Sequence, residues 1–367
     1  MKNWFENLIE KHHDLYLDVL NSKETYFFTS FLGENVSREK KEISTREELI
    51  VFSEALKINH QIKVLNVGDV ELGEEGMKII SNFLKLNPNF IHIHFSGTFI
   101  GNGLKILIES LEHNSKIKLE ELGLPRNILR DEEMTHLSNF LKSNSTLKKL
   151  DLEDNIFEKN GLDRLGQALS VNSTLTEIHL GFNYFIGKDL KFLKLKENSS
   201  LINLDLSNSS LGDIGFKILC EDLRFNSSLK VLNISGCDFG GKVLILLSQF
   251  LKVNCCLVEL NMHGTEFKED DMSSIIDSLK VNCSLTKFGF NFKIFSNKKI
   301  EKQILFLLNC NEGWSPEFHY LSNQIFKDSI FSFLLCLKRS NSKVTKFVLF
   351  EIIKKIDRKI YFEKWPN

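Results

Sequence analysis

One phrase returns along the chain at an almost constant interval, and this periodicity limits the possible folds more than any other feature. "SNSTLKKLDLEDNIF" from Ser143 is followed by "VNSTLTEIHLGFNYF" from Val171, four further copies lie downstream, and three weaker copies lie upstream. Successive copies are 28, 29, 28, 28, 26, 28, 28 and 28 residues apart. The nine copies begin at the apolar residues Ile62, Phe90, Leu119, Leu147, Leu175, Leu201, Leu229, Leu257 and Leu285. A repeat of this length predicts stacked units that share a continuous core.

Each copy combines two different apolar spacings. The pattern L-x-x-L-x-L-x-x-N, clearest from Leu147 to Asn155, predicts a short strand with one buried face. Further along the same copy, Leu162, Leu165 and Leu169 fall on one stripe of a helix. Each unit is therefore predicted to be a strand, a loop and a helix, whose apolar faces are buried only when the units stack.

The strand phrase, the repeat length and the helical second half together resemble leucine-rich repeats of the ribonuclease-inhibitor type. The sensing domains of NOD-like receptors and Ran GTPase-activating protein share this type of repeat. The resemblance covers residues 57–312. It implies an α/β leucine-rich repeat solenoid, a horseshoe of about nine repeats with parallel strands on the concave face and helices on the convex face.

Two segments flank the predicted repeats. Residues 1–56 are predicted to form an N-terminal helical cap with a degenerate repeat, in which Leu49, Phe52 and Leu56 share one helical stripe. Residues 313–367 break the period and are predicted to form a basic helical C-terminal tail or cap. This tail resembles the short helical tails of amoeboid protist repeat proteins and, weakly, helices that dock ubiquitin-ligase adaptors. A cap and a docking module both remain open.

Composition and cysteine usage point to a protein of the cytoplasm. The chain is 42% hydrophobic and 26% charged, with a net charge of −1, which does not favour a nucleic-acid partner. It contains no apolar run long enough for a membrane span. Its seven cysteines include no C-x-x-C pair, and we expect free structural thiols in a reducing compartment.

Two Asn positions recur in the repeats. The Asn before each strand, as in Asn144 and Asn172, begins a triplet that would be a glycosylation sequon if it occurred once. Its periodic placement instead predicts a turn between helix and strand, with the Asn in the left-handed conformation. The Asn at the end of the strand phrase, as in Asn155 and Asn183, is predicted to bond main-chain groups of the loop.

Charged residues of neighbouring copies align on the exposed side of the predicted strands. Because adjacent strands lie about 4.8 Å apart, these side chains should form one predominantly acidic surface. Like charges gathered in this way favour a partner of opposite charge. We predict that a protein with a basic surface binds there, on a strand-face cluster that consists of Glu121, Lys149, Asp151, Glu153, Glu177, His179 and Asp205.

Catalysis and metal binding are weaker interpretations of the same face. His179 should lie between Asp151 and Asp205, and His92 and His94 lie near Glu121, so an oriented base or a metal site is conceivable. No nucleophile, no His on the strand next to His179 and no enclosed pocket accompany these groups. The prediction is therefore no catalytic residue, no metal and no cofactor.

The leading functional hypothesis is a non-enzymatic scaffold that binds a protein on its concave face. A ubiquitin-ligase substrate adaptor acting through the C-terminal helices is one alternative. A regulator of a small GTPase is another, although Arg126 and Arg130 match no catalytic arginine residue by residue. The phosphate-binding loop motif of NOD-like receptors is absent from the sequence.

Overall fold

The computed structural model describes residues 2–21, 26–29, 46–183, 186–265, 272–282, 284–291 and 298–312. The chain divides into two compact units, Met1–Asp238 and Phe239–Asn367. The predicted C-terminal tail, residues 313–367, lies outside the described residues, so its role as a cap or a docking module stays a prediction.

Within its described residues, the first unit contains eight strands, and neighbours in chain order pair in parallel. Its strands are β1 (Tyr26–Thr29), β2 (Val64–Gly68), β3 (His92–Ser96), β4 (Glu121–Gly123), β5 (Lys149–Asp151), β6 (Glu177–His179), β7 (Asn203–Asp205) and β8 (Val231–Asn233). Its helices are α1 (Lys2–Lys11), α2 (His13–Asn21), α3 (Arg46–Ile58), α4 (Gly73–Leu84), α5 (Gly103–His113), α6 (Glu133–Ser143), α7 (Lys159–Leu169), the 3-10 helix η1 (Gly187–Leu193) and α8 (Gly212–Leu223).

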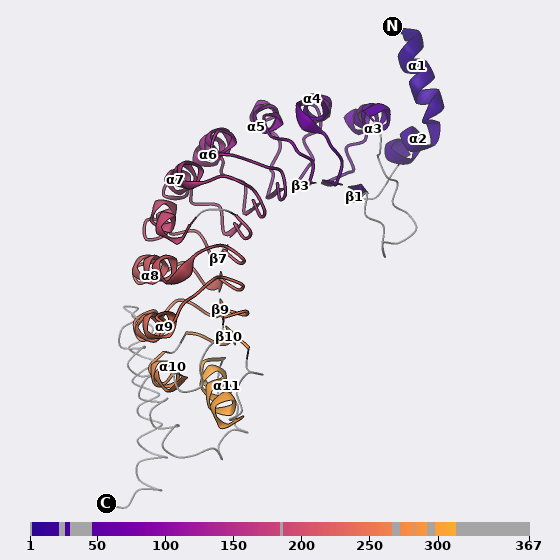
Figure 1. Ribbon diagram of the computed structural model, residues 1–367. Coiled ribbons are helices and arrows are strands. Elements are labelled where there is room, and N and C mark those ends of the chain that lie inside the picture. Colours follow the sequence, from indigo (N-terminus) through magenta and orange to yellow (C-terminus); the bar gives the residue numbers. More distant parts are fainter. Residues whose placement is uncertain are drawn as a thin grey trace, which may run out of the picture. The chain divides into compact units, whose positions relative to one another are not determined.

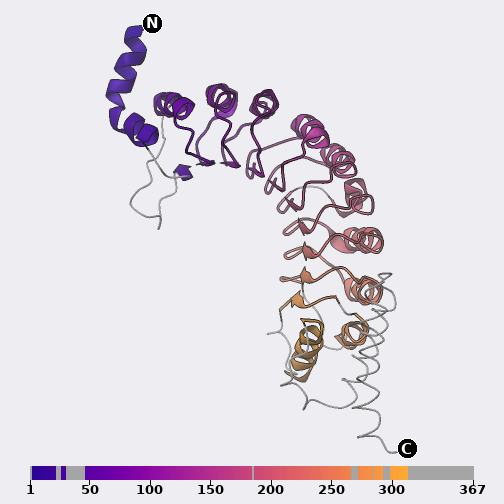
Figure 2. The same ribbon diagram turned by 180° about the vertical axis from the view of Figure 1, so that it is seen from behind.

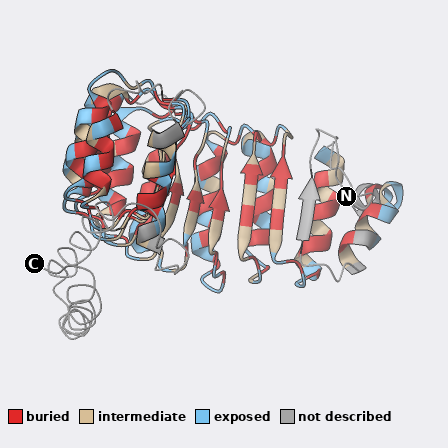
Figure 3. Ribbon diagram, turned by 90° about the horizontal axis from the view of Figure 1, so that it is seen from below, coloured by how far each residue is buried: buried red, intermediate tan, exposed pale blue. Residues whose placement is uncertain are grey.

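The strands and helices of the first unit form two separate layers. From β2 to β8 the strands line the inner side of an arc and the helices lie on its outer side, as both views show (Figures 1 and 2). Leu150 and Leu152 on the strand side and Leu162, Leu165 and Leu169 on α7 are all fully buried between the layers. The apolar residues of the strand pattern and of the helix pattern therefore share one core. Along the strands, buried and half-buried residues alternate (Figure 3).

The second unit repeats the same alternation. It contains α9 (Val243–Leu251), β9 (Glu259–Asn261), α10 (Met272–Leu279), β10 (Lys287–Gly289) and α11 (Lys298–Glu312). Strands β9 and β10 pair in parallel. A strand is present in all nine predicted copies, from β2 to β10, and the predicted α/β class with parallel strands is confirmed.

The Asn at the end of the strand phrase links successive repeats, as predicted. Asn155 Nδ2 donates to the carbonyl oxygen of Leu124 in the preceding repeat at 2.9 Å, and its Oδ1 accepts from the main-chain N–H groups of Asn127 and Leu129 at 3.1 and 3.0 Å. Asn183 donates in the same way to Leu152 at 2.9 Å. These amides satisfy loop groups that would otherwise be buried without partners.

The Asn that precedes each strand has a different role from the one predicted. Asn144 lies in the extended region, with φ −74° and ψ 131°, and the left-handed conformation expected there is wrong. The turn is held by the side chain, because Asn172 Oδ1 accepts from the N–H groups of Thr174 and Leu175 at 3.0 and 2.8 Å. Asn172 Nδ2 donates to the Leu141 carbonyl of the preceding repeat at 2.7 Å. The triplet is thus part of the repeat's hydrogen bonding.

Three local features depart from the regular pattern. The helix predicted at the start of the chain is two helices, α1 and α2, with a turn at His12. Strand β1 extends the parallel sheet in a segment that lacks the repeat phrase. The 26-residue step after Leu175 coincides with η1, a 3-10 helix in place of the usual α-helix, which agrees with the predicted shortening.

Three cysteines of the described residues, Cys220, Cys237 and Cys256, are free thiols. Cys237 occupies the Asn position of its repeat and is buried, and its thiol donates to the Leu206 carbonyl at 3.4 Å. Burial raises the pKa of Cys237 to about 11. A thiol protonated at neutral pH in that position has a structural role.

Candidate functional site

The strand-face cluster lies on four adjacent strands of the first unit, in the register expected from the repeats. Glu121, Lys149, Glu177 and Asn203 are consecutive partners across β4 to β7. One row further along, Gly123, Asp151, His179 and Asp205 are paired in the same way. Glu153 follows β5 directly and is half-buried. The structure therefore brings all seven predicted residues onto one face.

The short strands place these side chains on the solvent side. The middle residue of each strand, such as Leu150 in β5 and Ile178 in β6, is fully buried against the helices. Its neighbours point to the opposite face because side chains alternate along a strand. Every member of the cluster is partly exposed, so the strand face is accessible without any rearrangement.

The first row is an ion-pair network centred on Lys149. Lys149 Nζ lies 3.4 Å from Glu121 Oε1 and 3.1 Å from Glu177 Oε1. Glu177 also accepts from Asn203 Nδ2 at 3.3 Å and lies 2.8 Å from His179 Nε2. The sequence predicts a group of carboxylates with one lysine among them. In the structure, that lysine neutralises part of their charge.

The pKa values of this row reflect the pairing. Burial raises the pKa of Glu177, but hydrogen bonds from His179 and Lys149 outweigh it and the pKa is lowered overall. Burial lowers the pKa of Lys149, but the hydrogen bond to Glu177 and the charges of Glu121 and Glu177 outweigh it, so that pKa is raised. Both groups are charged at neutral pH, and the ion pair is maintained.

The two His residues of β3 contact the other end of this row. His94 Nε2 lies 3.3 Å from Glu121 Oε1, and His92 Nδ1 lies 3.7 Å from Glu121 Oε2. A Cβ atom at Gly123 would lie 2.1 Å from His94 Nδ1, so a glycine is required there for the imidazole to fit. Burial lowers the pKa of His94 despite the nearby Glu121 charge, which favours the neutral imidazole.

The two aspartates of the second row have a structural function that sequence reasoning did not assign. Asp151 Oδ1 accepts from the Glu153 N–H at 2.9 Å, and Asp205 Oδ1 accepts from the Ser207 N–H at 2.8 Å. Asn233, at the same position of β8, bonds the Ser235 N–H at 3.2 Å. The recurrence of Asp or Asn at this position is the sequence signal for these turns.

The least compensated charge of the cluster lies around Glu153. Burial, followed by the charges of Asp151 and Asp205, raises the pKa of Glu153. These three carboxylates make no ion pair with a Lys or Arg of the described residues, although His179 opposes part of their charge. The strand face therefore has two parts. One is the paired row centred on Lys149, and the other, called the acidic row below, consists of Asp151, Glu153 and Asp205.

Among the residues that the structure describes, no group of three or more His, Cys, Asp or Glu side chains is arranged to hold a metal ion. Arg126 is engaged by its neighbours, with its guanidinium 3.1 Å from Asp69 Oδ1 and 3.0 Å from Ser96 Oγ.

Within the described ranges, none of the helices has the length and apolar character needed to cross a bilayer.

Comparison with known proteins agrees with this fold. A family model described as Leucine Rich repeat matches residues 143–166 and 225–248, which include β5 and β8 and the start of the helix after each. The two matched segments are therefore leucine-rich repeats, and the neighbouring units alternate strand and helix in the same way. The human and mouse leiomodin-2 proteins are each 26% identical to this chain over 104 residues. The aligned segment is 28% of this chain and 19% of leiomodin-2.

Two solved structures overlap with part of this chain. The structure titled "Leiomodin-1 Actin-Binding Site 2 (ABS2)" has 20% sequence identity and a TM-score of 0.30, covering 41% of this chain and 72% of its own. The tropomodulin C-terminal domain of Caenorhabditis elegans has 16% identity and a TM-score of 0.31, covering 50% of this chain and 93% of its own.

Proposed function

We propose that this protein is a non-enzymatic scaffold that binds a protein partner on the strand face of its leucine-rich repeats. The observation that carries the proposal is the acidic row formed by Asp151, Glu153 and Asp205, which lacks Lys and Arg partners in the described residues. Burial and then repulsion from Asp151 and Asp205 raise the pKa of Glu153, and a partner that supplies Lys or Arg side chains would relieve the repulsion. The register of β5 to β7 holds these groups on a rigid surface, which keeps the ordering cost of binding small.

The paired row has a different part in this proposal. Glu121, Lys149 and Glu177 already satisfy one another, so a partner would have to break existing ion pairs to use them. We assign them to the border of the contact surface, where they hold the face in register. The repeats are further proposed to be of the ribonuclease-inhibitor type, which the α-helices α4 to α7, one in each repeat of 28 or 29 residues, support.

The test is affinity capture with charge-neutral variants that preserve side-chain shape. A triple variant combines Asp151→Asn, Glu153→Gln and Asp205→Asn in one chain. It keeps the oxygen acceptors for the turns and removes three charges. Proteins captured by the wild-type chain should be lost from this variant and retained by Glu112→Gln, an exposed residue of α5. Each captured protein is then purified and titrated. Equal affinity for the triple variant and the wild type would contradict the proposal.

A further inference from the structure

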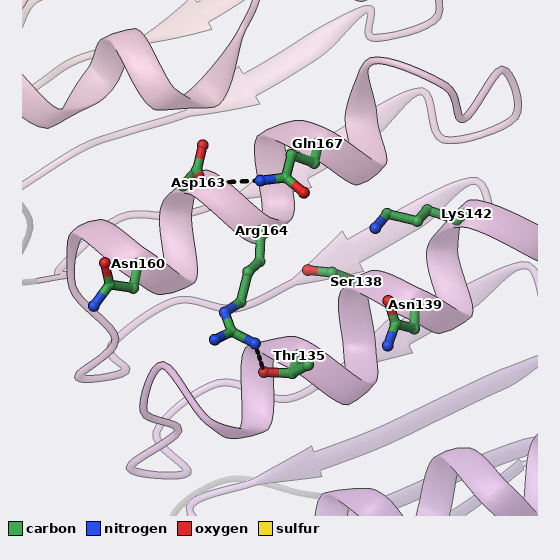
Figure 4. A pocket seen from close by; sticks show the side chains of 8 residues that line it. All are labelled: Thr135, Ser138, Asn139, Lys142, Asn160, Asp163, Arg164 and Gln167. Carbon is green, nitrogen blue, oxygen red and sulfur yellow. Dashed lines mark hydrogen bonds between the residues drawn. The ribbon is translucent and has the colours of Figure 1, made fainter.

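A second polar feature lies on the outer, helical side of the first unit, in the groove between α6 and α7. Its volume is about 400 Å³, and polar side chains from both helices line it (Figure 4). Thr135, Ser138 and Lys142 come from α6, and Arg164 and Gln167 come from α7. None of these residues belongs to the strand-face cluster, so the groove requires a separate explanation.

The Ser138 hydroxyl at this groove has no hydrogen-bond partner. Ser138 is 2% exposed, and its Oγ atom bonds no other group of the described residues. Figure 4 shows this hydroxyl directed into the space between the two helices, between the Arg164 and Lys142 side chains. A buried hydroxyl without a partner is costly in free energy and uncommon in folded proteins.

Serines at the same helix position in other repeats show that a partner is normally found. Ser81 Oγ donates to the Lys78 carbonyl at 2.9 Å, and Ser110 Oγ donates to the Ile106 carbonyl at 2.6 Å. Both bonds are made within the serine's own helix, where α6 offers equivalent carbonyl groups. The Ser138 hydroxyl is instead buried beside the groove without a partner among the described residues.

Two cations beside this hydroxyl also lack carboxylate partners. Lys142 forms no ion pair within the described residues, and Arg164 donates to the Thr135 hydroxyl. Asp163 lines the groove too, but its carboxylate accepts from Gln167 Nε2 at 2.9 Å. Some cations on other helices are paired, such as Lys217 with Glu221 at 3.7 Å. The groove therefore has an excess of positive charge and of hydrogen-bond donors.

We propose that the groove between α6 and α7 binds an oxyanion of the phosphate class. Lys142 and Arg164 would supply charge-assisted hydrogen bonds, and the Ser138 hydroxyl would donate to a third oxygen. A phosphate group suits these donors because it carries three strong acceptor oxygens and a charge of about −1.5 to −2 at neutral pH. The volume of the groove leaves room for a group attached to the phosphate. This site is independent of the protein-binding face.

Calorimetric titration of the full chain at constant ionic strength tests this proposal, with inorganic phosphate and O-phosphoserine as probes and serine as the blank. We expect one saturable site. Lys142→Gln and Arg164→Gln should each weaken binding by about tenfold, since each removes a charge-assisted hydrogen bond. Tighter binding of O-phosphoserine would point to a phosphorylated side chain as the natural source, and tighter binding of phosphate to a free anion; both results support the site.

Two serine variants separate binding from stability. Ser138→Ala should weaken phosphate binding several-fold without lowering the melting temperature of the free protein, because the hydroxyl has no partner to lose. Ser110→Ala should lower the melting temperature and leave phosphate binding unchanged. Lys217→Gln on α8 is the matched charge control. The proposal is overturned if neither probe binds saturably, or if Lys217→Gln weakens binding as much as Lys142→Gln does.

Discussion

The strand face and the α6–α7 groove lie on opposite sides of the same repeats, and their lysines are in opposite situations. On the strand face, Lys149 lies between two carboxylates, at 3.4 Å from Glu121 and 3.1 Å from Glu177. In the groove, Lys142 forms no ion pair within the described residues, and the buried Ser138 hydroxyl beside it has no partner. The number of charged residues in a region therefore does not indicate how many of them are available to a ligand.

The spacing of the two layers explains the difference. Strands in one sheet lie about 4.8 Å apart, so side chains in register reach those of the next repeat and pair. Packed helices lie roughly 8–10 Å apart, and a short side chain such as Ser138 spans only part of that distance. Repeats stacked in this way can pair charges between neighbouring strands, as in the row of Lys149, and leave space between neighbouring helices.

The largest expected effect comes from a residue buried between the two layers. Leu152 is fully buried, and Leu152→Asp places an unpaired charge in the core. We expect a loss of more than about 4 kcal/mol in the free energy of unfolding, measured by urea denaturation. Ile214→Asp on α8, where the side chain is 65% exposed, should change it by less than about 0.5 kcal/mol. If Leu152→Asp abolished partner binding and left phosphate binding intact, the two sides would not depend on one core.

A smaller effect distinguishes a paired lysine from an unpaired one. Lys149→Met keeps the aliphatic stem but leaves the half-buried Glu121 and Glu177 facing each other, which should cost about 1–2 kcal/mol. Lys142→Met breaks no ion pair of the described residues and should change stability by less than about 0.5 kcal/mol. Urea denaturation of the two variants compares them directly. Equal losses would contradict the contrast between the two regions.

The sequence predicts the fold and the face well because both depend on periodicity. The alternation of Leu147, Leu150 and Leu152 determines which side of the strand is buried, and the repeat length determines which residues are neighbours. All seven residues of the strand-face cluster consequently lie where they were predicted. Strand β1 was not predicted, because its segment lacks the repeat phrase.

Interactions that depend on side-chain conformation could not be predicted in the same way. Ser110 and Ser138 hold equivalent positions in successive repeats, yet only Ser110 bonds a helix carbonyl. The Asn before each strand was assigned a left-handed backbone, whereas the structure uses its side-chain amide. The carboxylates were counted as one repulsive patch, although Lys149 and His179 contact two of them. Sequence identifies the groups that can meet, and the packing decides which contacts form.

The smallest expected effect distinguishes the two rows of the strand face by their pH dependence. The lowered pKa of Glu177 contributes stability that is present above the ordinary Glu pKa and is lost as the pH falls through the lowered value. The pKa of Glu153 is raised, so its contribution has the opposite sign: it is present at low pH and is lost as the pH rises through the raised value.

Substituting each glutamate separately should therefore move the stability curve in opposite directions. At neutral pH, Glu177→Gln should lower the free energy of unfolding by up to about 1 kcal/mol. Glu153→Gln should raise it by a few tenths of a kcal/mol after screening by solvent, since it removes a charge held beside Asp151 and Asp205. Both differences should shrink towards zero as the pH falls below the ordinary Glu range, which urea denaturation at successive pH values would show. If Glu153→Gln were less stable than the wild type at neutral pH, other groups of the free protein would stabilise this carboxylate. The acidic row would then have no uncompensated charge for a partner to pair with.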